Sequence, residues 1–181
     1  MRGAHRNVTV ASMLGGRTER LALEPLGHEH ADGLVAALDH PSVGAFLGGP
    51  DVTTVEALHA RIDWLRDAAL PGEQFLNFAI RRLADGAILG RLEATVHPTW
   101  AELAYLVGPA YQRQGYAREA TRWLLSALFA TGATELWAAV HPANTASLRL
   151  LAALAFSPRA STPHTLGSYD PGDLLFSLRR A

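Results

Sequence analysis

The turn at residues 111–117, with the sequence YQRQGYA, constrains the fold of this chain more than any other feature. It lies between an apolar run at 103–107, which predicts a strand, and residues 117–130, which predict a helix. A helix that begins directly after a strand presents backbone N–H groups without intrahelical partners, and its dipole adds partial positive charge there. Gly115 lets the backbone approach a ligand closely. The turn therefore favours a phosphate or pyrophosphate, with an ordinary strand–turn–helix crossover as the structural alternative.

Arginine side chains would add formal charge around the same turn. Arg113 lies within it, and Arg118 and Arg122 follow one turn apart on the expected helix. No Gly-Lys-Ser/Thr follows the glycine, and the G-x-G-x-x-G pattern is absent. The turn is thus neither a Walker loop nor a dinucleotide-binding loop.

Composition narrows the class of protein. The chain has 181 residues, of which 49% are hydrophobic and 18% charged, with a formal net charge of −1. No apolar run reaches the roughly 18 residues of a membrane span, and the net charge gives no general attraction to nucleic acid. The sequence contains no cysteine, which excludes disulfides, cysteine zinc sites and a cysteine acyl-enzyme. The histidines show no repeated spacing with carboxylates, so no metal site is predicted.

The remaining sequence alternates between patterns of strands and helices, without repeats. Residues 1–17 read as a mobile N-terminal tail, and 18–181 as a single domain. We therefore predict an α/β layered fold with a mainly antiparallel sheet covered by helices. The strands are expected at 18–26, 75–82, 87–96, 101–107, 136–140 and 174–179, and the helices at 28–39, 55–69, 117–130 and 144–151.

Two motifs resemble those of a known family. Gln112-x-x-Gly115-x-Ala117 is similar to the Gln/Arg-x-x-Gly-x-Gly/Ala signature of the GNAT superfamily of N-acetyltransferases, where it holds the pyrophosphate of acetyl-coenzyme A (acetyl-CoA). Asn144-x-x-Ser147, closed by Phe156, resembles the second signature of the family. Upstream, residues 20–26 and 101–105 resemble the branch of the RimJ and RimL ribosomal-protein N-terminal acetyltransferases. The resemblance covers roughly residues 18–180.

The resemblance implies a GNAT fold: a central, mostly antiparallel mixed sheet of about seven strands with one splayed pair, and about four flanking helices. The pantetheine arm of the co-substrate would lie between the strands at 101–107 and 136–140. The residues that the resemblance assigns to acetyl-CoA binding are Leu106, Val107, Gln112, Arg113, Gln114, Gly115, Tyr116, Ala117, Arg118, Asn144 and Ser147.

Acetylation of an amine needs a base for the amine proton and a hydrogen bond for the leaving thiolate. Glu102 matches the glutamate of the family pattern Ala-Glu-Ile/Leu-Gly-Tyr and is the expected base, acting through water. Glu93, in the middle of an apolar strand, is the reserve candidate. The tyrosine that many relatives carry seven residues after the asparagine is Leu151 here, and Ser147 takes its place in the RimJ/RimL-like branch.

The resemblance implies acetyl transfer to a primary amine, by direct transfer in a ternary complex. At neutral pH, deprotonation costs about 4 kcal/mol for a lysine but only about 1 kcal/mol for an α-amine, which favours a protein or peptide N-terminus or a small amine of lowered pKa. The alternatives are a non-catalytic acetyl-CoA sensor or inactive subunit, and a nucleotide-phosphate binding module. A cytoplasmic location, without nucleic acid or membrane partners, is expected. A homodimer is left open.

Overall fold

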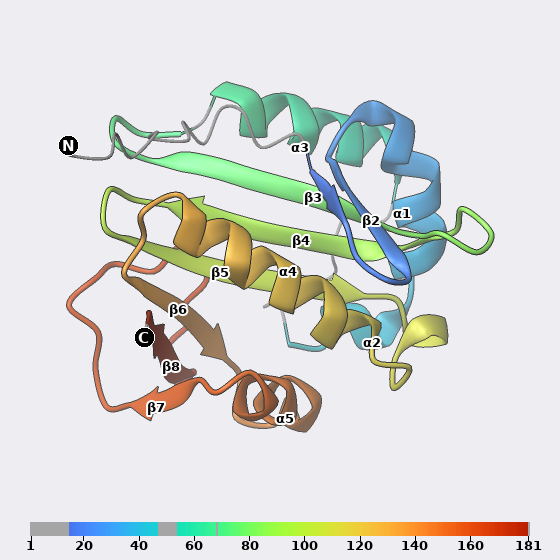
Figure 1. Cartoon of the computed structure of the whole chain (residues 1–181). Coiled ribbons are helices and arrows are strands. Elements are labelled where there is room, and N and C mark those ends of the chain that lie inside the picture. The colour runs from blue at the N-terminus through green and yellow to red at the C-terminus, as the bar shows by residue number, and fades with distance from the viewer. Residues whose placement is uncertain (1–14, 47–53, 68, 181) are drawn as a thin grey trace, which may run out of the picture.

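An eight-stranded mixed sheet forms the centre of the protein (Figure 1). The computed structural model describes residues 15–46, 54–67 and 69–180. The strands lie in the order β1-β2-β3-β4-β5-β6-β8-β7, and every neighbouring pair is antiparallel except β5 and β6. Their bounds are β1 Gly16–Arg17, β2 Leu21–Pro25, β3 Gln74–Arg82, β4 Ile88–Val96, β5 Trp100–Val107, β6 Glu135–Val140, β7 Ser157–Arg159 and β8 Leu174–Arg179.

Helices cover both faces of this sheet. The helices α1 and α3 pack on one face and α4 on the other, while α5 lies beside β6 and the C-terminal strands (Figure 1). Phe78 and Ile80 of β3 belong to the cluster under α4, whereas Ala79 between them belongs to the cluster under α1 and α3. The helices are η2 His28–His30, α1 Ala31–Leu38, α2 Pro41–Gly44, α3 Val55–Asp67, η3 Pro109–Tyr111, α4 Tyr116–Ala130 and α5 Thr145–Ala153.

The strands β5 and β6 separate after a short common ladder. They pair in parallel at only three positions, of which the last joins Glu102 to Trp137. Both strands continue beyond this point, β5 to Val107 and β6 to Val140. The resulting splay is the feature that the family resemblance implies, and it leaves one edge of β5 without a partner strand.

The predicted α/β layered fold is confirmed, and its differences from the expectation are local. The sheet has eight strands rather than about seven. The described residues contain five α-helices rather than about four, because α2 forms a separate four-residue helix. The short strand β1 lies within the stretch 1–17 that was expected to be a mobile tail, and residues 1–14 lie outside the described part of the chain. Ala155, where the family has glycine, takes the left-handed φ of 65° and turns the chain toward buried Phe156.

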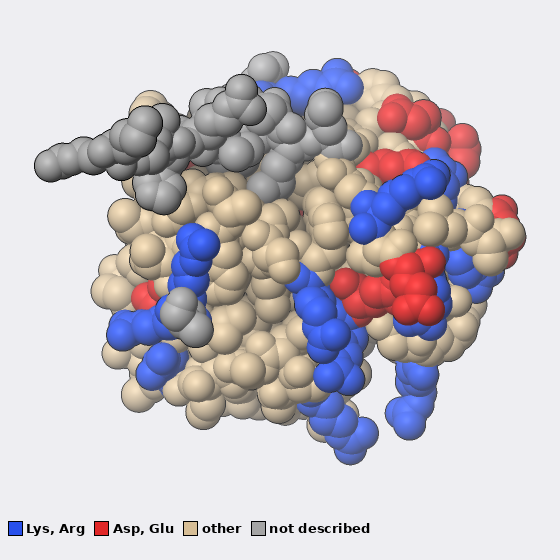
Figure 2. Space-filling model, in the orientation of Figure 1, with Lys and Arg blue, Asp and Glu red and all other residues tan. Residues whose placement is uncertain are grey.

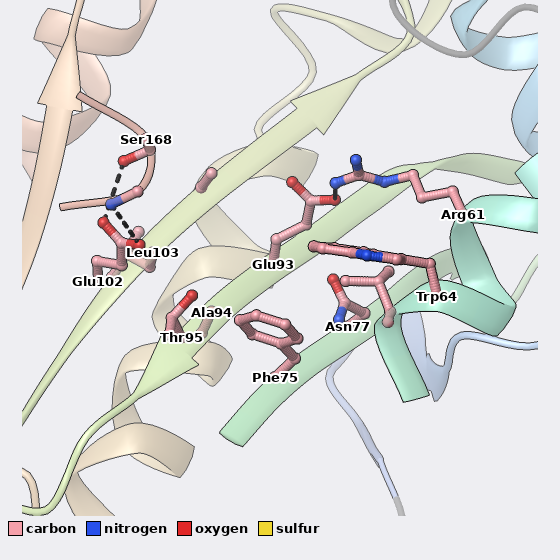
Figure 3. Close-up of a pocket in the computed structure, with 13 residues that line it drawn as sticks. Arg61, Trp64, Phe75, Asn77, Glu93, Ala94, Thr95, Glu102, Leu103 and Ser168 are labelled. Carbon is pink, nitrogen blue, oxygen red and sulfur yellow. Dashed lines mark hydrogen bonds and ion pairs between the residues drawn. The ribbon is translucent and has the colours of Figure 1, made fainter. Parts of the chain in front are cut away.

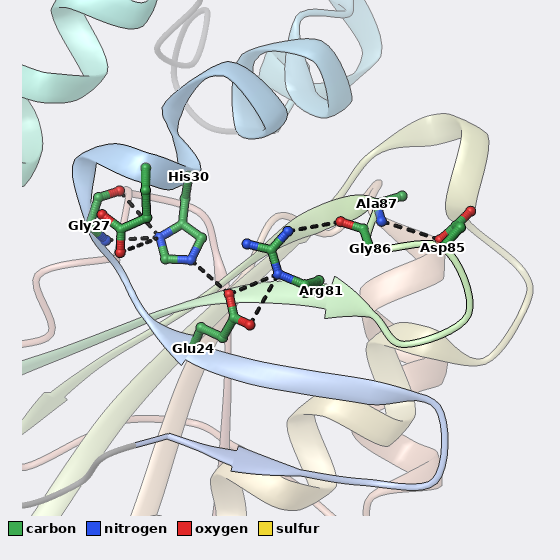
Figure 4. A network of polar contacts seen from close by, with 8 residues as sticks. Glu24, Gly27, His30, Arg81, Asp85, Gly86 and Ala87 are labelled. Carbon is green, nitrogen blue, oxygen red and sulfur yellow. Dashed lines mark hydrogen bonds and ion pairs between the residues drawn. The ribbon is translucent and has the colours of Figure 1, made fainter.

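A partly buried polar network connects the start of α1 to the sheet (Figure 4). His30 is only 2% exposed. Its Nδ1 accepts a hydrogen bond from the Gly27 N–H at 3.0 Å, which leaves Nε2 to donate to Glu24 Oε2 at 2.9 Å. Arg81 Nε donates to both oxygens of Glu24, at 3.0 and 2.9 Å. Glu24 thus joins the strands β2 and β3 to the helical segment that follows β2.

Candidate active site

The turn before α4 presents a set of backbone donors. Gly115 has a φ of 84°, and Arg113 adopts the left-handed φ of 59°. The first intrahelical hydrogen bond runs from the Glu119 N–H to the Gly115 carbonyl at 3.0 Å. The N–H groups of residues 114–117 donate to no acceptor among the described residues. This concentration of unpaired donors at a helix N-terminus is suited to a phosphate group.

The two glutamines of the turn hold it in shape. Gln112 Nε2 donates to the carbonyl oxygen of Val107 at 3.0 Å, and Gln114 Nε2 donates to that of Ala110 at 3.1 Å. Both side chains therefore bind the backbone that leads from β5 into the turn. The sequence assigned these glutamines to the co-substrate, and the structure gives their side-chain amides a second, structural task.

Arg20 is a site residue that the sequence analysis did not single out. Its Nη1 donates to the carbonyl oxygen of Gln114 at 3.0 Å, and its Nε pairs with Glu119 Oε2 at 2.7 Å. The guanidinium also lies 4.6 Å from the centre of the Tyr116 ring. No local pattern reveals these contacts, because the partners lie more than ninety residues apart in the chain.

Arginine side chains surround the turn on the solvent side. Arg113, Arg118 and Arg122 are exposed, and none forms an ion pair with another described residue. Figure 2 shows arginines across the α4 face of the molecule, with most of the acidic side chains at the right of the view and some of them directly beside arginines. These three arginines are free to bind an external anion.

The backbones of Leu106 and Val107, the two β5 residues assigned to the pantetheine arm, point in opposite directions. The Gly108 N–H donates to the carbonyl oxygen of Leu89 in β4. The carbonyl oxygen of Leu106 lies so close to Gly90 of β4 that a Cβ atom at position 90 would collide with it. Backbone groups alternate in direction along a strand, so those of Val107 face the opening toward β6. The Leu106 backbone points to β4 and away from the gap. The gap-facing residues are therefore Val107 and, two positions earlier, Tyr105.

Asn144 and Ser147 lie together at the start of α5. Asn144 Oδ1 accepts a hydrogen bond from the Ser147 N–H at 3.1 Å, so the asparagine is the N-cap of this helix. The amide nitrogen of Asn144 has no partner among the described residues. The capping role and a contact to the co-substrate are thus compatible.

The phenol of Tyr105 also lies at the start of α5. Its hydroxyl donates to the Ser147 carbonyl oxygen at 3.5 Å, a long hydrogen bond. Burial raises the pKa of Tyr105 to about 12, against a smaller opposing effect of the contact with Ser147. The sequence analysis placed no role on this side chain. The family pattern places a tyrosine on the helix, where this chain has Leu151, whereas the structure provides one from β5.

Glu102 lies where the gap between β5 and β6 begins, and it lines a pocket of about 350 Å³ (Figure 3). The side chain is 7% exposed. Its Oε1 accepts a hydrogen bond from the Gly167 N–H at 3.0 Å, and Oε2 accepts one from Ser168 Oγ at 3.4 Å. The carboxylate is therefore held in place by the loop before β8. The sequence could not show this contact, since loop conformation is not encoded in a local pattern.

Glu93 lines the same pocket but is engaged in ion pairs. Its Oε1 accepts from Arg61 Nη2 at 2.8 Å and from Arg91 Nε at 3.0 Å. Burial opposes ionisation of this carboxyl, but the charges and hydrogen bonds of Arg91 and Arg61 prevail and lower the pKa of Glu93 below its ordinary value. A carboxylate stabilised in this way is a poor proton acceptor, so Glu102 is the better candidate for the base.

The described residues contain no cluster of three or more histidine, aspartate and glutamate side chains that could bind a metal ion. Among those residues there is also no helix with the length and apolar character of a membrane span.

Solved structures of similar fold include several acetyltransferases. Mycobacterium smegmatis RimJ in complex with CoA-disulfide is 23% identical, with a TM-score of 0.72 over 88% of this chain and 81% of that chain. A ribosomal-protein-S5-alanine acetyltransferase from Vibrio fischeri is 18% identical, with a TM-score of 0.70 over 91% of this chain and 96% of that chain. An acetyltransferase from Agrobacterium tumefaciens strain C58 is 24% identical, with a TM-score of 0.70 over 92% and 94%. At these identities the likeness concerns the fold, and it includes the RimJ branch that the sequence resembles.

No curated protein matches the sequence significantly. Residues 20–157 match the family model of the acetyltransferase (GNAT) domain, which confirms the resemblance seen in the two motifs. This match spans most of the chain, from Arg20, which supports the turn before α4, to the strand that follows α5. The protein therefore belongs to the GNAT family of acetyltransferases.

Proposed function

We propose that this protein transfers the acetyl group of acetyl-CoA directly to a primary amine while both substrates are bound. The observation that carries the proposal is the arrangement along β5. The unpaired edge of this strand begins at Glu102, beside the pocket, and ends at the turn with free backbone donors before α4. A donor bound along that edge would meet an acceptor in the pocket next to a carboxylate.

The described residues fit acetyl-CoA, which supplies the acetyl group as a thioester. The N–H groups of residues 114–117 would receive the pyrophosphate, with Arg113 and Arg118 beside them. The gap-facing N–H of Val107, whose carbonyl oxygen already accepts from Gln112, and the free amide nitrogen of Asn144 would bind the pantetheine arm. In this assignment Leu106 supports the strand β4 and does not contact the co-substrate.

The acceptor amine would lie in the pocket and lose its proton to a water molecule held by Glu102. That first proton passes through the water to Glu102. The neutral nitrogen then forms the new N–C bond as the C–S bond of the thioester breaks, and the second proton leaves the nitrogen for the departing thiolate. The departing thiolate needs only a hydrogen bond or a proton, since a thiol has a pKa of about 8.5. The hydroxyl groups of Tyr105 and Ser147 are the donors near the gap.

Turnover of acetyl-CoA with a panel of small amines, amino acids and peptides tests the proposal, with release of the free thiol as the signal. Calorimetry compares the affinity of the protein for coenzyme A with its affinity for ATP. Acetylation of one class of amine, with coenzyme A bound more tightly than ATP, is expected. Tight binding of coenzyme A without acetylation of any amine would instead support a non-catalytic sensor. Preference for ATP would support a nucleotide-phosphate binding module.

A further inference from the structure

The pocket beside Glu102 contains polar side chains whose hydrogen-bonding groups have no partner among the described residues. Arg61 carries five N–H donors, yet its one hydrogen bond to a described residue is the bond from Nη2 to Glu93, and its Nε is buried without a partner. The side chains of Asn77 and Thr95 also line the pocket and form no hydrogen bond with a described residue. All three side chains are half-buried and only Arg61 Nε is fully buried, so their remaining polar groups are available to a polar ligand that enters the pocket.

The register of β4 and β5 sets the distance between these polar groups and Glu102. In the ladder of β4 and β5, Glu102 lies opposite Thr95, and Glu93 lies two positions further along its strand. Glu102 and Glu93 are thus diagonal neighbours, about 7–8 Å apart. Arg61 reaches Glu93 from α3, on the side away from Glu102 (Figure 3). The pocket therefore has a carboxylate at one end and a guanidinium with free donors at the other.

Aromatic side chains form another part of the pocket wall. Trp64 of α3 stacks on Phe75 of β3 with ring centres 6.0 Å apart, and both line the pocket. Trp64 is 59% exposed, which is unusual for a tryptophan. This wall offers an apolar surface to the side chain of a bound molecule.

We propose that the acceptor is an amine that also carries a carboxylate, as a free amino acid with an apolar side chain does. The amine lies beside Glu102, and the carboxylate receives hydrogen bonds from Arg61 and Asn77. The planar guanidinium matches a carboxylate in charge and geometry, whereas the first peptide carbonyl of a protein N-terminus is neutral. This inference rests on the proposed acetyl transfer, because it names the substrate class for the same pocket.

The test compares phenylalanine with phenylalaninamide as acceptors. The carboxylate of the free acid raises the pKa of its own amine, so amine reactivity alone favours the amide. We expect kcat/KM to be about 10-fold to 100-fold higher for the acid, as a charge-assisted hydrogen bond predicts. Equal or higher kcat/KM for the amide would overturn the inference and favour a protein N-terminus.

Substitution of Arg61 tests whether this residue causes the preference for the acid over the amide. Arg61→Gln should lower the ratio of kcat/KM for the acid to kcat/KM for the amide, mainly by raising KM for the acid, and Arg61→Lys should keep part of the preference. Arg66→Gln is the matched control, since Arg66 lies on the same helix but is exposed and pairs with Asp63. If Arg61→Gln fails to fold, the Arg61→Lys protein decides. A preference unchanged in that variant, or lost equally in the control, would contradict the role of Arg61.

Equilibrium binding separates this inference from the proposed function. Calorimetry with coenzyme A-loaded protein measures the affinity of acid and amide without any acetyl transfer. Tighter binding of the acid supports the inference even if no amine is acetylated, which would refute only the proposed function. Equal affinities, together with acetylation of both compounds, would refute the inference and leave the proposed function intact.

Discussion

The guanidinium of Arg20 donates a hydrogen bond to the carbonyl oxygen of Gln114 at 3.0 Å, so a residue next to β2 supports the turn before α4. Because the same side chain also pairs with Glu119, Arg20→Ala removes two restraints from this turn. We expect the affinity for coenzyme A to fall about tenfold, since one charge-assisted hydrogen bond accounts for a change of this size. Calorimetry measures it, with the exposed Arg17→Ala as control. Unchanged affinity would show that the turn keeps its shape without Arg20.

Substitution of Gly115 should abolish coenzyme A binding. Its φ of 84° disfavours a β-branched residue, and the added methyl groups would stand among the backbone donors. The strain of such a residue is about 1–3 kcal/mol. Gly132→Val, at the other end of α4, is the control. Gly132 also has a positive φ, 104°, so valine there carries comparable backbone strain, and the open space around it means that the added Cβ meets no other atom. A folded Gly115→Val protein that binds coenzyme A as tightly as the Gly132→Val protein would contradict the assignment of the turn.

Replacement of Glu102 should slow the chemical step. General-base assistance amounts to about 10²–10⁴ in rate, so Glu102→Gln should lower kcat by this factor at pH 7 with acetyl-CoA affinity retained. The deficit should shrink as pH rises, because more of the amine is then already neutral. Glutamine keeps an acceptor for the Gly167 N–H, which limits structural effects. Wild-type turnover of this variant at pH 7 would transfer the role to bulk solvent or to Glu93.

Tyr105 should remain protonated over the working range of the enzyme. With its pKa raised to about 12 by burial, one of the four tyrosines should ionise about two pH units later than an ordinary phenol in an ultraviolet titration. Tyr105→Phe should remove this late transition. The raised pKa stabilises the fold below about pH 10, and that contribution is lost as pH rises toward 12.

The same variant tests the hydrogen bond to the leaving thiolate. If Tyr105 serves the thiolate, Tyr105→Phe lowers kcat more than Ser147→Ala does, with little change in KM for acetyl-CoA. A larger loss in Ser147→Ala would return this task to the serine that the family resemblance indicates. Both losses should be smaller than that of Glu102→Gln.

The network of Glu24, His30 and Arg81 should make stability depend on pH (Figure 4). Burial opposes ionisation of Glu24, but hydrogen bonds from His30 and Arg81 outweigh it and lower its pKa below the ordinary 4.5. A depressed folded-state pKa adds stability above the unfolded-state pKa, and this stability is lost as pH falls through the folded value. The difference in free energy of unfolding between wild type and Glu24→Gln should thus be present at pH 7 and decline as pH falls through the lowered pKa of Glu24. The exposed Glu19→Gln should show no such trend.

The order of the strands and helices could be predicted from the sequence because each leaves a local signature. The apolar runs at β3 to β6 and the helical period of α4 depend on neighbours within a few residues. The strands β1 and β7 have two and three residues and lack such a signature. They exist because a longer neighbouring strand presents an edge to which they pair.

The candidate site likewise has features that short sequence motifs predict and features that they do not. The donors near Gly115 and the cap at Asn144 follow from short motifs, and the structure places both where the motifs indicate. The supports of the site come from distant parts of the chain: Arg20 for the turn, and Gly167 with Ser168 for Glu102. Such contacts depend on tertiary folding, which a single sequence does not display.

The loop that holds Glu102 also limits how this site can evolve. Gly167 and Ser168 restrain the carboxylate, and the same two residues form part of the pocket wall. A substitution there that admits a different acceptor would also move Glu102, the residue proposed as the base. Changes of acceptor range through this loop should therefore reduce turnover, whereas changes at Trp64, on the opposite helix, alter the pocket without touching the restraint on Glu102. New specificities are accordingly expected to arise first on the α3 side of the pocket.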